Sequence, residues 1–169
     1  MSKNTWKEVE NIILSHGAVG VRRVNPHEVP TAEWVRLKCQ FGCDGYGQCL
    51  TCPPYAPTPD QTRRLLDCYS TGFLIYWGNE AGGREVLAKI ERQVFLKGWY
   101  KAFAMGTGPC DLCGECNLKG PCAHPSQARP SMEASGIDVF QTARHAGFPI
   151  QVVTRRRDVP DFYSLLLVE

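Results

Sequence analysis

Eight of the nine cysteines stand in two compact groups of four. The first cysteine group has the spacing Cys-x3-Cys-x5-Cys-x2-Cys and consists of Cys39, Cys43, Cys49 and Cys52. The second cysteine group has the spacing Cys-x2-Cys-x2-Cys-x5-Cys and consists of Cys110, Cys113, Cys116 and Cys122. Thiols this close together on glycine-rich loops can converge on one small object, because the backbone wraps around it and aims N–H groups at the sulfurs. The two groups therefore predict two metal-binding sites.

The second cysteine group carries the sharper signal for an iron–sulfur cluster. Its triplet Cys110-x2-Cys113-x2-Cys116 matches the opening of the bacterial ferredoxin run. The fourth member departs from that run, because Cys122 follows after five residues rather than three. In two-cluster ferredoxins the fourth cysteine ligates the other cluster, and Cys52 is followed by proline as such a cysteine is. The sequence predicts two 4Fe-4S clusters with four consecutive ligands each, and leaves an exchange of Cys52 and Cys122 open.

Zinc is the alternative cofactor at these cysteines. Structural zinc sites commonly use two short cysteine pairs separated by roughly 12–20 residues, whereas each group here closes within one loop. His124, two residues after Cys122, can replace a cysteine ligand in the way that histidine does in Rieske centres. The ninth cysteine, Cys68, is expected to be a small buried hydrophobic residue.

Two segments near the groups have both a functional and a structural interpretation. The stretch 128–139 follows the second cysteine group and has two interpretations. It either covers a cluster, with Arg129 offsetting the negative charge, or forms a turn that packs the loop; the residues concerned are Arg129, Ser131, Met132 and Glu133. The run Arg155-Arg156-Arg157 reads as a solvated turn, and alternatively as a basic patch that docks an acidic redox partner.

Composition places the chain among ordinary globular proteins. Of the 169 residues, 43% are hydrophobic and 21% are charged, and the net charge is +2. The sequence has no secretory signal peptide and no apolar run of about 18 residues, so we expect a cytoplasmic protein without a membrane span. A reducing compartment favours metal ligands over disulfides for the cysteines. We expect no nucleic-acid partner, and the oligomeric state stays open.

The elements that position these loops alternate between helix and strand patterns. Amphipathic or capped helices are predicted over 5–16, from Thr58 onward, over 84–97 and over 138–146. Strands are predicted over 18–24, 33–38, 73–77, 99–105, 150–153 and 162–168. The strand–helix–strand order across 73–105 predicts a βαβ unit with parallel pairing. We therefore expect one α+β domain over residues 1–169, with a mixed sheet, helices packed on it and two cysteine-rich cluster-binding loops.

Three stretches carry a resemblance to a known family. They are Cys39-Gln-Phe-Gly-Cys43-Asp-Gly-Tyr46-Gly47, Gly108-Pro109-Cys110-Asp-Leu-Cys113-Gly-Glu-Cys116 and Arg129-Pro130-Ser131-Met132-Glu133. In these stretches, and over nearly its whole length, the chain resembles a family of small predicted metal-binding (iron–sulfur) proteins of unknown function, typical of anaerobes. The resemblance implies metal binding by the eight cysteines in a cytosolic protein, and it supplies no reaction.

Two functions follow from two clusters. Eight thiolates leave no open coordination site on the irons they bind, which favours electron transfer with a redox partner protein. The alternative is an enzyme, or an enzyme subunit, in which one labile cluster iron acts on a small molecule. A zinc-binding structural or interaction module is the second alternative. The sequence leaves open whether the protein is an enzyme.

Overall fold

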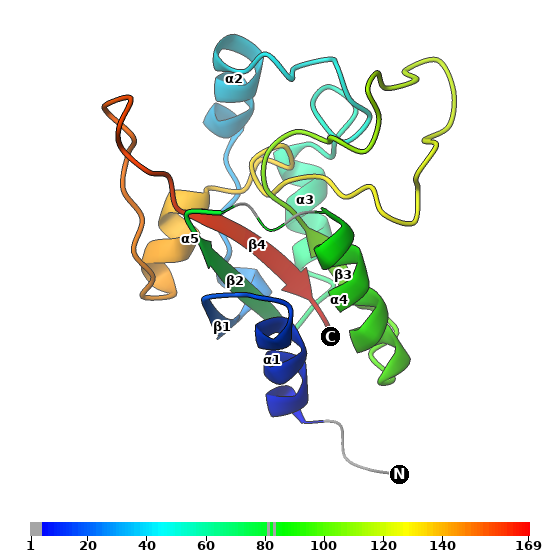
Figure 1. Ribbon diagram of the computed structural model, residues 1–169, viewed down its shortest axis with the longest axis vertical. Helices are drawn as coiled ribbons and strands as arrows, with labels where there is room; N and C mark the ends of the chain where they lie inside the picture. Colours follow the sequence, from blue (N-terminus) through cyan, green and yellow to red (C-terminus); the bar gives the residue numbers. More distant parts are fainter. Residues whose placement is uncertain (1–4, 81, 83) are drawn as a thin grey trace.

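A computed structural model describes residues 5–80, 82 and 84–169, and within them the chain forms a four-stranded antiparallel sheet in the order β1-β2-β4-β3 (Figure 1). The strands are β1 (Gly20–Val24), β2 (Gly72–Gly78), β3 (Phe103–Met105) and β4 (Phe162–Leu167). The helices of the described part are α1 (Trp6–Ser15), the 3-10 helix η1 (Pro26–Glu28), α2 (Glu33–Gly42), α3 (Pro59–Leu66), α4 (Arg84–Leu96) and α5 (Val139–His145). None of these helices is both long and apolar enough to cross a membrane.

Helices cover both faces of the sheet because its central strands are apolar on both sides. On β4, Tyr163 and Leu165 pack with α3 and α5, whereas Leu166 packs with α1 and α4. Successive side chains of a strand point to opposite faces, so one apolar strand serves two cores. Ser164 is fully buried on the α1 and α4 side, where its hydroxyl accepts from the indole nitrogen of Trp77 at 3.0 Å. The result is a three-layer α/β/α arrangement.

The single α+β domain predicted from the sequence is confirmed, but the mixed sheet is wrong in its pairing. The unit β2-α4-β3 is present, and its two strands run parallel to each other, since each pairs antiparallel with β4. Strand β4 lies between them. The strands β2 and β3 therefore form a split βαβ unit and are not hydrogen-bonded to each other. Strand β4, from later in the chain, occupies the position between them.

The strand predicted over 33–38 is helix α2, which continues through Gly42. Val35 and Leu37 alternate with polar residues and so mimic a strand, yet only Val35 is buried, and Leu37 is 54% exposed. A helix places Val35 and Cys39 on one face, four residues apart. The first cysteine of the first group therefore stands on a helix, and not on a loop as the glycine content of the segment indicated.

Some of the remaining predicted elements are confirmed, one is shortened, and the strand predicted over 150–153 is wrong. The capping box of α3 is present, with the Thr58 hydroxyl accepting from the Gln61 backbone at 3.2 Å and the Gln61 side chain accepting from the Thr58 backbone at 2.8 Å. Asp138 caps α5 as expected. The strand predicted over 99–105 shrinks to β3. Residues 150–153 form no strand, and both Val152 and Val153 are exposed.

Both cysteine-rich loops lie at the same end of the molecule. Figure 1 shows the cyan segment after α2 and the yellow-green segment after β3 above the sheet, on the side opposite α1. A Cβ on Gly45 would stand 3.2 Å from the Pro109 ring, so the first loop approaches the second where only a glycine fits easily. The sheet and its helices thus hold two loops, far apart in sequence, against each other.

Candidate metal centre

Helix α2 and the loop after it position the first cysteine group. Cys39 lies on the last turns of α2, and Cys43 is its C-terminal cap. The loop then turns back on itself, with the Gly47 N–H donating to the Pro53 carbonyl at 2.8 Å. Gly47 has a φ of +71°, a conformation that favours glycine. This turn returns Cys52 to the neighbourhood of Cys39 and Cys43.

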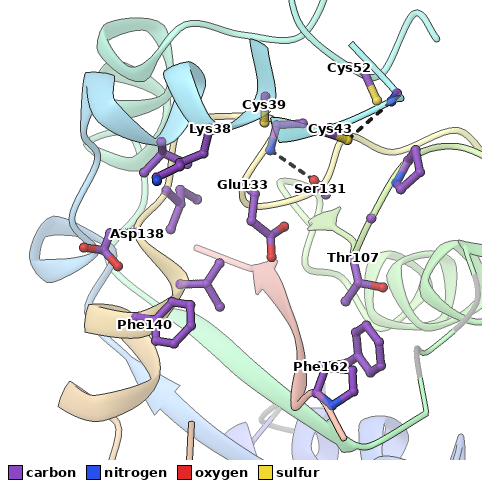
Figure 2. Close-up of a pocket in the computed structure, with 18 of the residues that line it drawn as sticks. Lys38, Cys39, Cys43, Cys52, Thr107, Ser131, Glu133, Asp138, Phe140 and Phe162 are labelled. Carbon is purple, nitrogen blue, oxygen red and sulfur yellow. Dashed lines mark hydrogen bonds between the residues drawn. The ribbon is translucent and has the colours of Figure 1, made fainter. Parts of the chain in front are cut away.

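Three members of the first cysteine group line a large cavity, which we call the α2 cavity. Its volume is about 520 Å³, and its sulfur-bearing wall consists of Cys39, Cys43 and Cys52. In Figure 2 these three sulfurs lie on one side of the cavity, and Phe140 and Phe162 lie on the opposite side. A volume of this size is in the range of small-molecule sites, roughly 300–1,000 Å³. The α2 cavity therefore has room beyond the thiols themselves.

The second cysteine group surrounds a much smaller pocket. All four of its thiols line a space of about 80 Å³, and Cys49 of the first group lines it with them. The Cys49 thiol donates to the Cys110 carbonyl at 3.5 Å. The next N–H along the chain, that of Leu50, donates to the Cys116 sulfur at 3.5 Å. The structure thus brings three cysteines together at the α2 cavity and five at the small pocket, with Cys49 between the groups.

Backbone N–H groups point at several of the sulfurs. The Gly45 N–H donates to Cys43 at 3.4 Å, and the His124 N–H donates to Cys122 at 3.4 Å. Such N–H···S bonds stabilise thiolates and tune the potential of iron–sulfur clusters. His124 itself is exposed and lines the small pocket, beside the cysteine that it was predicted to be able to replace.

The gathered thiols raise one another's pKa. The pKa lies above its ordinary value for Cys39, Cys49, Cys52 and Cys113. Burial is the first cause in each case, and neighbouring thiols add to it. A bound cation reverses this balance, because positive charge favours the thiolate. The donor set therefore fits a thiolate-ligated metal group.

The spacing between donors is wider than one ion requires. Within residues 5–80, 82 and 84–169, no three histidine, cysteine, aspartate or glutamate side chains are close enough to hold a single metal ion. A 4Fe-4S cluster makes a different demand, since each of its four thiolates binds a different iron. Binding of clusters by the eight cysteines, and which of them share one, stays a prediction.

The segment after the second cysteine group lines the α2 cavity instead of the small pocket. The Gly106 N–H donates to the Pro130 carbonyl at 2.8 Å, and the Met132 N–H donates to Gly106 at 3.1 Å, which fixes the segment beside β3. Met132 is fully buried in the core, whereas Ser131 and Glu133 face the cavity. The segment that was predicted to cover a cluster therefore lies beside the first cysteine group.

Glu133 brings a carboxyl group into this apolar space. Its Oε2 atom is fully buried and has no hydrogen-bond partner. Burial raises the pKa of Glu133, although its own backbone N–H and the Ser131 hydroxyl act in the opposite direction. Figure 2 shows the carboxyl group between the row of sulfurs and the two phenylalanines. Because Oε2 has no accessible surface in this conformation, a ligand in the α2 cavity reaches it when the Glu133 side chain turns toward the cavity.

Arg129 and Cys68 differ from their expected roles. Arg129 forms a two-bonded ion pair with Glu91 of α4, at 2.8 Å and 2.6 Å. The Glu91 carboxylate therefore neutralises the charge of Arg129. This favours the interpretation that the segment packs the loop over the interpretation that Arg129 offsets the charge of a cluster. Cys68 is exposed, and its thiol donates to the Arg64 carbonyl at 3.3 Å. Burial was the wrong expectation for Cys68, because α3 ends at Leu66 and the chain turns outward.

Comparison with known proteins gives one match. Residues 22–168 match the sequence model of a family described as predicted metal-binding protein (DUF2284). The description names metal binding and no particular metal. Neither a curated protein nor a solved structure matches.

Proposed function

The chain belongs to this family of predicted metal-binding proteins, and on that premise we propose that it binds two 4Fe-4S clusters, one at each cysteine group, and transfers electrons to a redox partner protein. The observation that carries the proposal is the contact of the two cysteine-rich loops, at Cys49 and Cys110. Two clusters held on touching loops are close neighbours, as electron transfer between them requires. When bound, such clusters supply one-electron transfer.

The surroundings of the first cysteine group support a protein partner. Leu37 and Phe41 stand on the same helix as Cys39 and are 54% and 80% exposed. Exposed apolar side chains next to a redox group offer a docking surface. The basic run 155–157, which is also exposed, would add attraction to an acidic partner. We also propose a cytoplasmic location, since a reducing compartment keeps such thiols free for metal.

Metal and sulfide analysis of anaerobically purified protein tests the proposal. We expect a brown protein with broad visible absorption and about eight irons and eight acid-labile sulfides per chain, since each cubane holds four of each. A colourless protein loaded with zinc would instead support the zinc-binding interaction module.

A second candidate function rests on the uneven distribution of the thiols. Three cysteines line the α2 cavity, and Cys49 lines the small pocket with the second cysteine group. A cluster held by Cys39, Cys43 and Cys52 alone would keep one iron without a thiolate, beside a cavity of about 520 Å³. The second candidate is therefore an enzyme that binds a small molecule at this iron.

The variant Cys49→Ser separates the two candidates. If Cys49 is the fourth ligand of the first cluster, the variant retains about four irons per chain. If the first cluster needs three thiolates only, Cys49→Ser keeps about eight irons and the same visible spectrum. Cys68→Ser is the matched control, because Cys68 is exposed and belongs to neither group.

A further inference from the structure

The α2 cavity combines apolar walls with one polar atom that has no partner. Trp34, Ile137, Phe140 and Phe162 form part of the wall. The Oε2 atom of Glu133 is fully buried among them without a hydrogen bond. A buried carboxyl oxygen without a hydrogen-bond partner destabilises the folded chain. A ligand that donates a hydrogen bond to this oxygen removes that cost, so the cavity favours a donor at this position.

The charges around the cavity decide which kind of donor fits. Asp138 and Asp161 also line it, and Lys38 is its one basic residue among those described. Asp138 is engaged with the N-terminus of α5, and Asp161 accepts from the Tyr76 hydroxyl at 2.8 Å. A cluster at the three thiols would add further negative charge. An anionic ligand is therefore disfavoured. A cation favours the charged form of the Glu133 carboxyl group against the effect of burial, and it gains a charge-assisted hydrogen bond.

We infer that the α2 cavity binds a small organic amine, whose ammonium group donates to Oε2 of Glu133 and whose apolar part lies along Phe140 and Phe162. The inference rests on the proposed function only in that the neighbouring cluster contributes negative charge. It names a substrate class for the second candidate function. Figure 2 shows how the parts are arranged, with the carboxyl group between the sulfurs and the aromatic side chains.

Anaerobic calorimetry with benzylamine on the full-length, cluster-loaded protein tests the inference. We expect saturable binding of one benzylamine per chain, and at least tenfold weaker binding to Glu133→Gln, which keeps the side-chain size but lacks the charge. Benzyl alcohol, which has the same ring and no charge, should bind weakly to the wild type. Its affinity for Glu133→Gln should be less than threefold lower. Glu85→Gln is the control, because Glu85 is an exposed residue of α4 that does not line the cavity.

A second variant guards against misfolding of Glu133→Gln. Phe140→Trp enlarges a side chain of the cavity wall, so it should weaken benzylamine and benzyl alcohol alike. An EPR spectrum of the reduced protein should change on addition of benzylamine, because the amine lies beside the first cluster.

The outcomes separate this inference from the proposed function. Absence of benzylamine binding to a protein with full iron and sulfide content would overturn the inference and leave the clusters in place. Equal affinity of wild type and Glu133→Gln would also overturn it. Benzylamine binding would support the cavity site even if the anaerobically purified protein contained no iron, and that absence of iron would itself count against the two-cluster proposal.

Discussion

At the scale of single residues, the nine cysteines fall into two chemical classes. Cys113 lines the small pocket among other thiols, and burial together with the nearby Cys116 raises its pKa. Cys68 lies outside both groups and is exposed. Neighbouring thiols are suited to share a metal group, because its positive charge favours their thiolate form, whereas a solitary exposed thiol lacks the neighbours that a cluster needs.

This difference predicts the effect of removing one sulfur. Cys113→Ser should reduce the iron content from about eight to about four per chain, because the second cluster loses a ligand of its x2/x2 triplet. Cys68→Ser should keep all of the iron. Iron and sulfide analysis with visible absorption measures both variants. Full iron content in Cys113→Ser would contradict the assignment of the second cysteine group.

Some site residues could be predicted from the sequence, and others could not. Spacing alone identifies the eight cysteines as candidate ligands. It does not reveal that Cys49 lies beside Cys110, because that depends on how two distant loops meet. Glu133 was expected near the second cysteine group, which precedes it in the chain. It faces the α2 cavity because hydrogen bonds to Gly106 fix its segment beside β3.

At the scale of secondary-structure elements, helix α2 shows where the sequence pattern is ambiguous. Alternating apolar residues over 33–38 favour a strand, whereas the spacing of Cys39 and Cys43 is that of one helix face. The helix prevails because Val35 and Cys39 then point to the same side, toward the α2 cavity. The spacing of four between the candidate ligands Cys39 and Cys43 is thus the signal that could have identified the last turn of this helix.

The ion pair between Arg129 and Glu91 ties the end of the second cysteine-rich loop to α4. The two side chains are only 12% and 14% exposed, and Glu91 also accepts from the Ala104 backbone at 2.8 Å. Glu91→Gln leaves the buried guanidinium without its charge partner, so the free energy of unfolding should fall by about 3 kcal/mol. Guanidinium chloride unfolding followed by circular dichroism measures the change.

A matched control for Glu91→Gln exists on the same helix. Glu85 pairs with Lys89 at 3.6 Å, and both side chains are more than half exposed. Glu85→Gln should lower the free energy of unfolding by no more than about 0.5 kcal/mol, because exposed pairs contribute little. Equal losses in the two variants would mean that the buried pair has no special role.

The turn formed by Thr154 and Asp158 shapes the chain between α5 and β4. The Asp158 carboxylate accepts from the backbone N–H groups of Thr154 and Arg155, at 2.9 Å and 2.8 Å. These two bonds hold the pKa of Asp158 below its ordinary 3.8. The turn lies between Val153 and Pro160, which both line the α2 cavity.

This lowered pKa predicts how the turn responds to pH. The carboxylate is favoured in the folded state, so its contribution is present above the unfolded pKa and is lost only as the pH falls through the lower folded value. The Thr154 and Arg155 amide signals in NMR should therefore stay constant from pH 7 to about 5. Asp158→Asn should shift both signals at pH 7. A midpoint above the ordinary aspartate pKa in the wild type would contradict this account.

At the scale of the whole molecule, composition and element order predict the class of the fold but not its strand pairing. One α+β domain with helices on a sheet follows from the alternation of periodic segments. The position of β4 between β2 and β3 does not, because it brings together segments about 60 residues or more apart. Local sequence patterns contain no information about that choice.

The cysteine-rich end and the sheet end should respond differently to loss of metal. One apolar core on each face of the sheet stabilises β2 and β4, whereas the cysteine-rich loops have few buried apolar residues. Chelation of iron should lower the melting temperature by roughly 10–20 °C, as a loss of about 5 kcal/mol would. Amide hydrogen exchange should rise in residues 43–57 and 107–128 and stay slow in β2 and β4.

The result that would refute this expectation is an unchanged melting temperature after iron removal. A uniform rise of exchange over the whole chain would indicate that the clusters are needed for the sheet as well as for the loops.

The late position of β4 has a consequence for how the protein matures. β4 begins at Phe162 and completes the sheet, whereas the last cysteine of either group is Cys122. A ribosome adds roughly 5–20 residues per second. It therefore synthesises every cysteine before β4, the strand that joins β2 to β3. In the folded chain the two cysteine-rich loops meet at Cys49 and Cys110. We therefore expect the two proposed clusters to reach their final geometry only after β4 has joined the sheet.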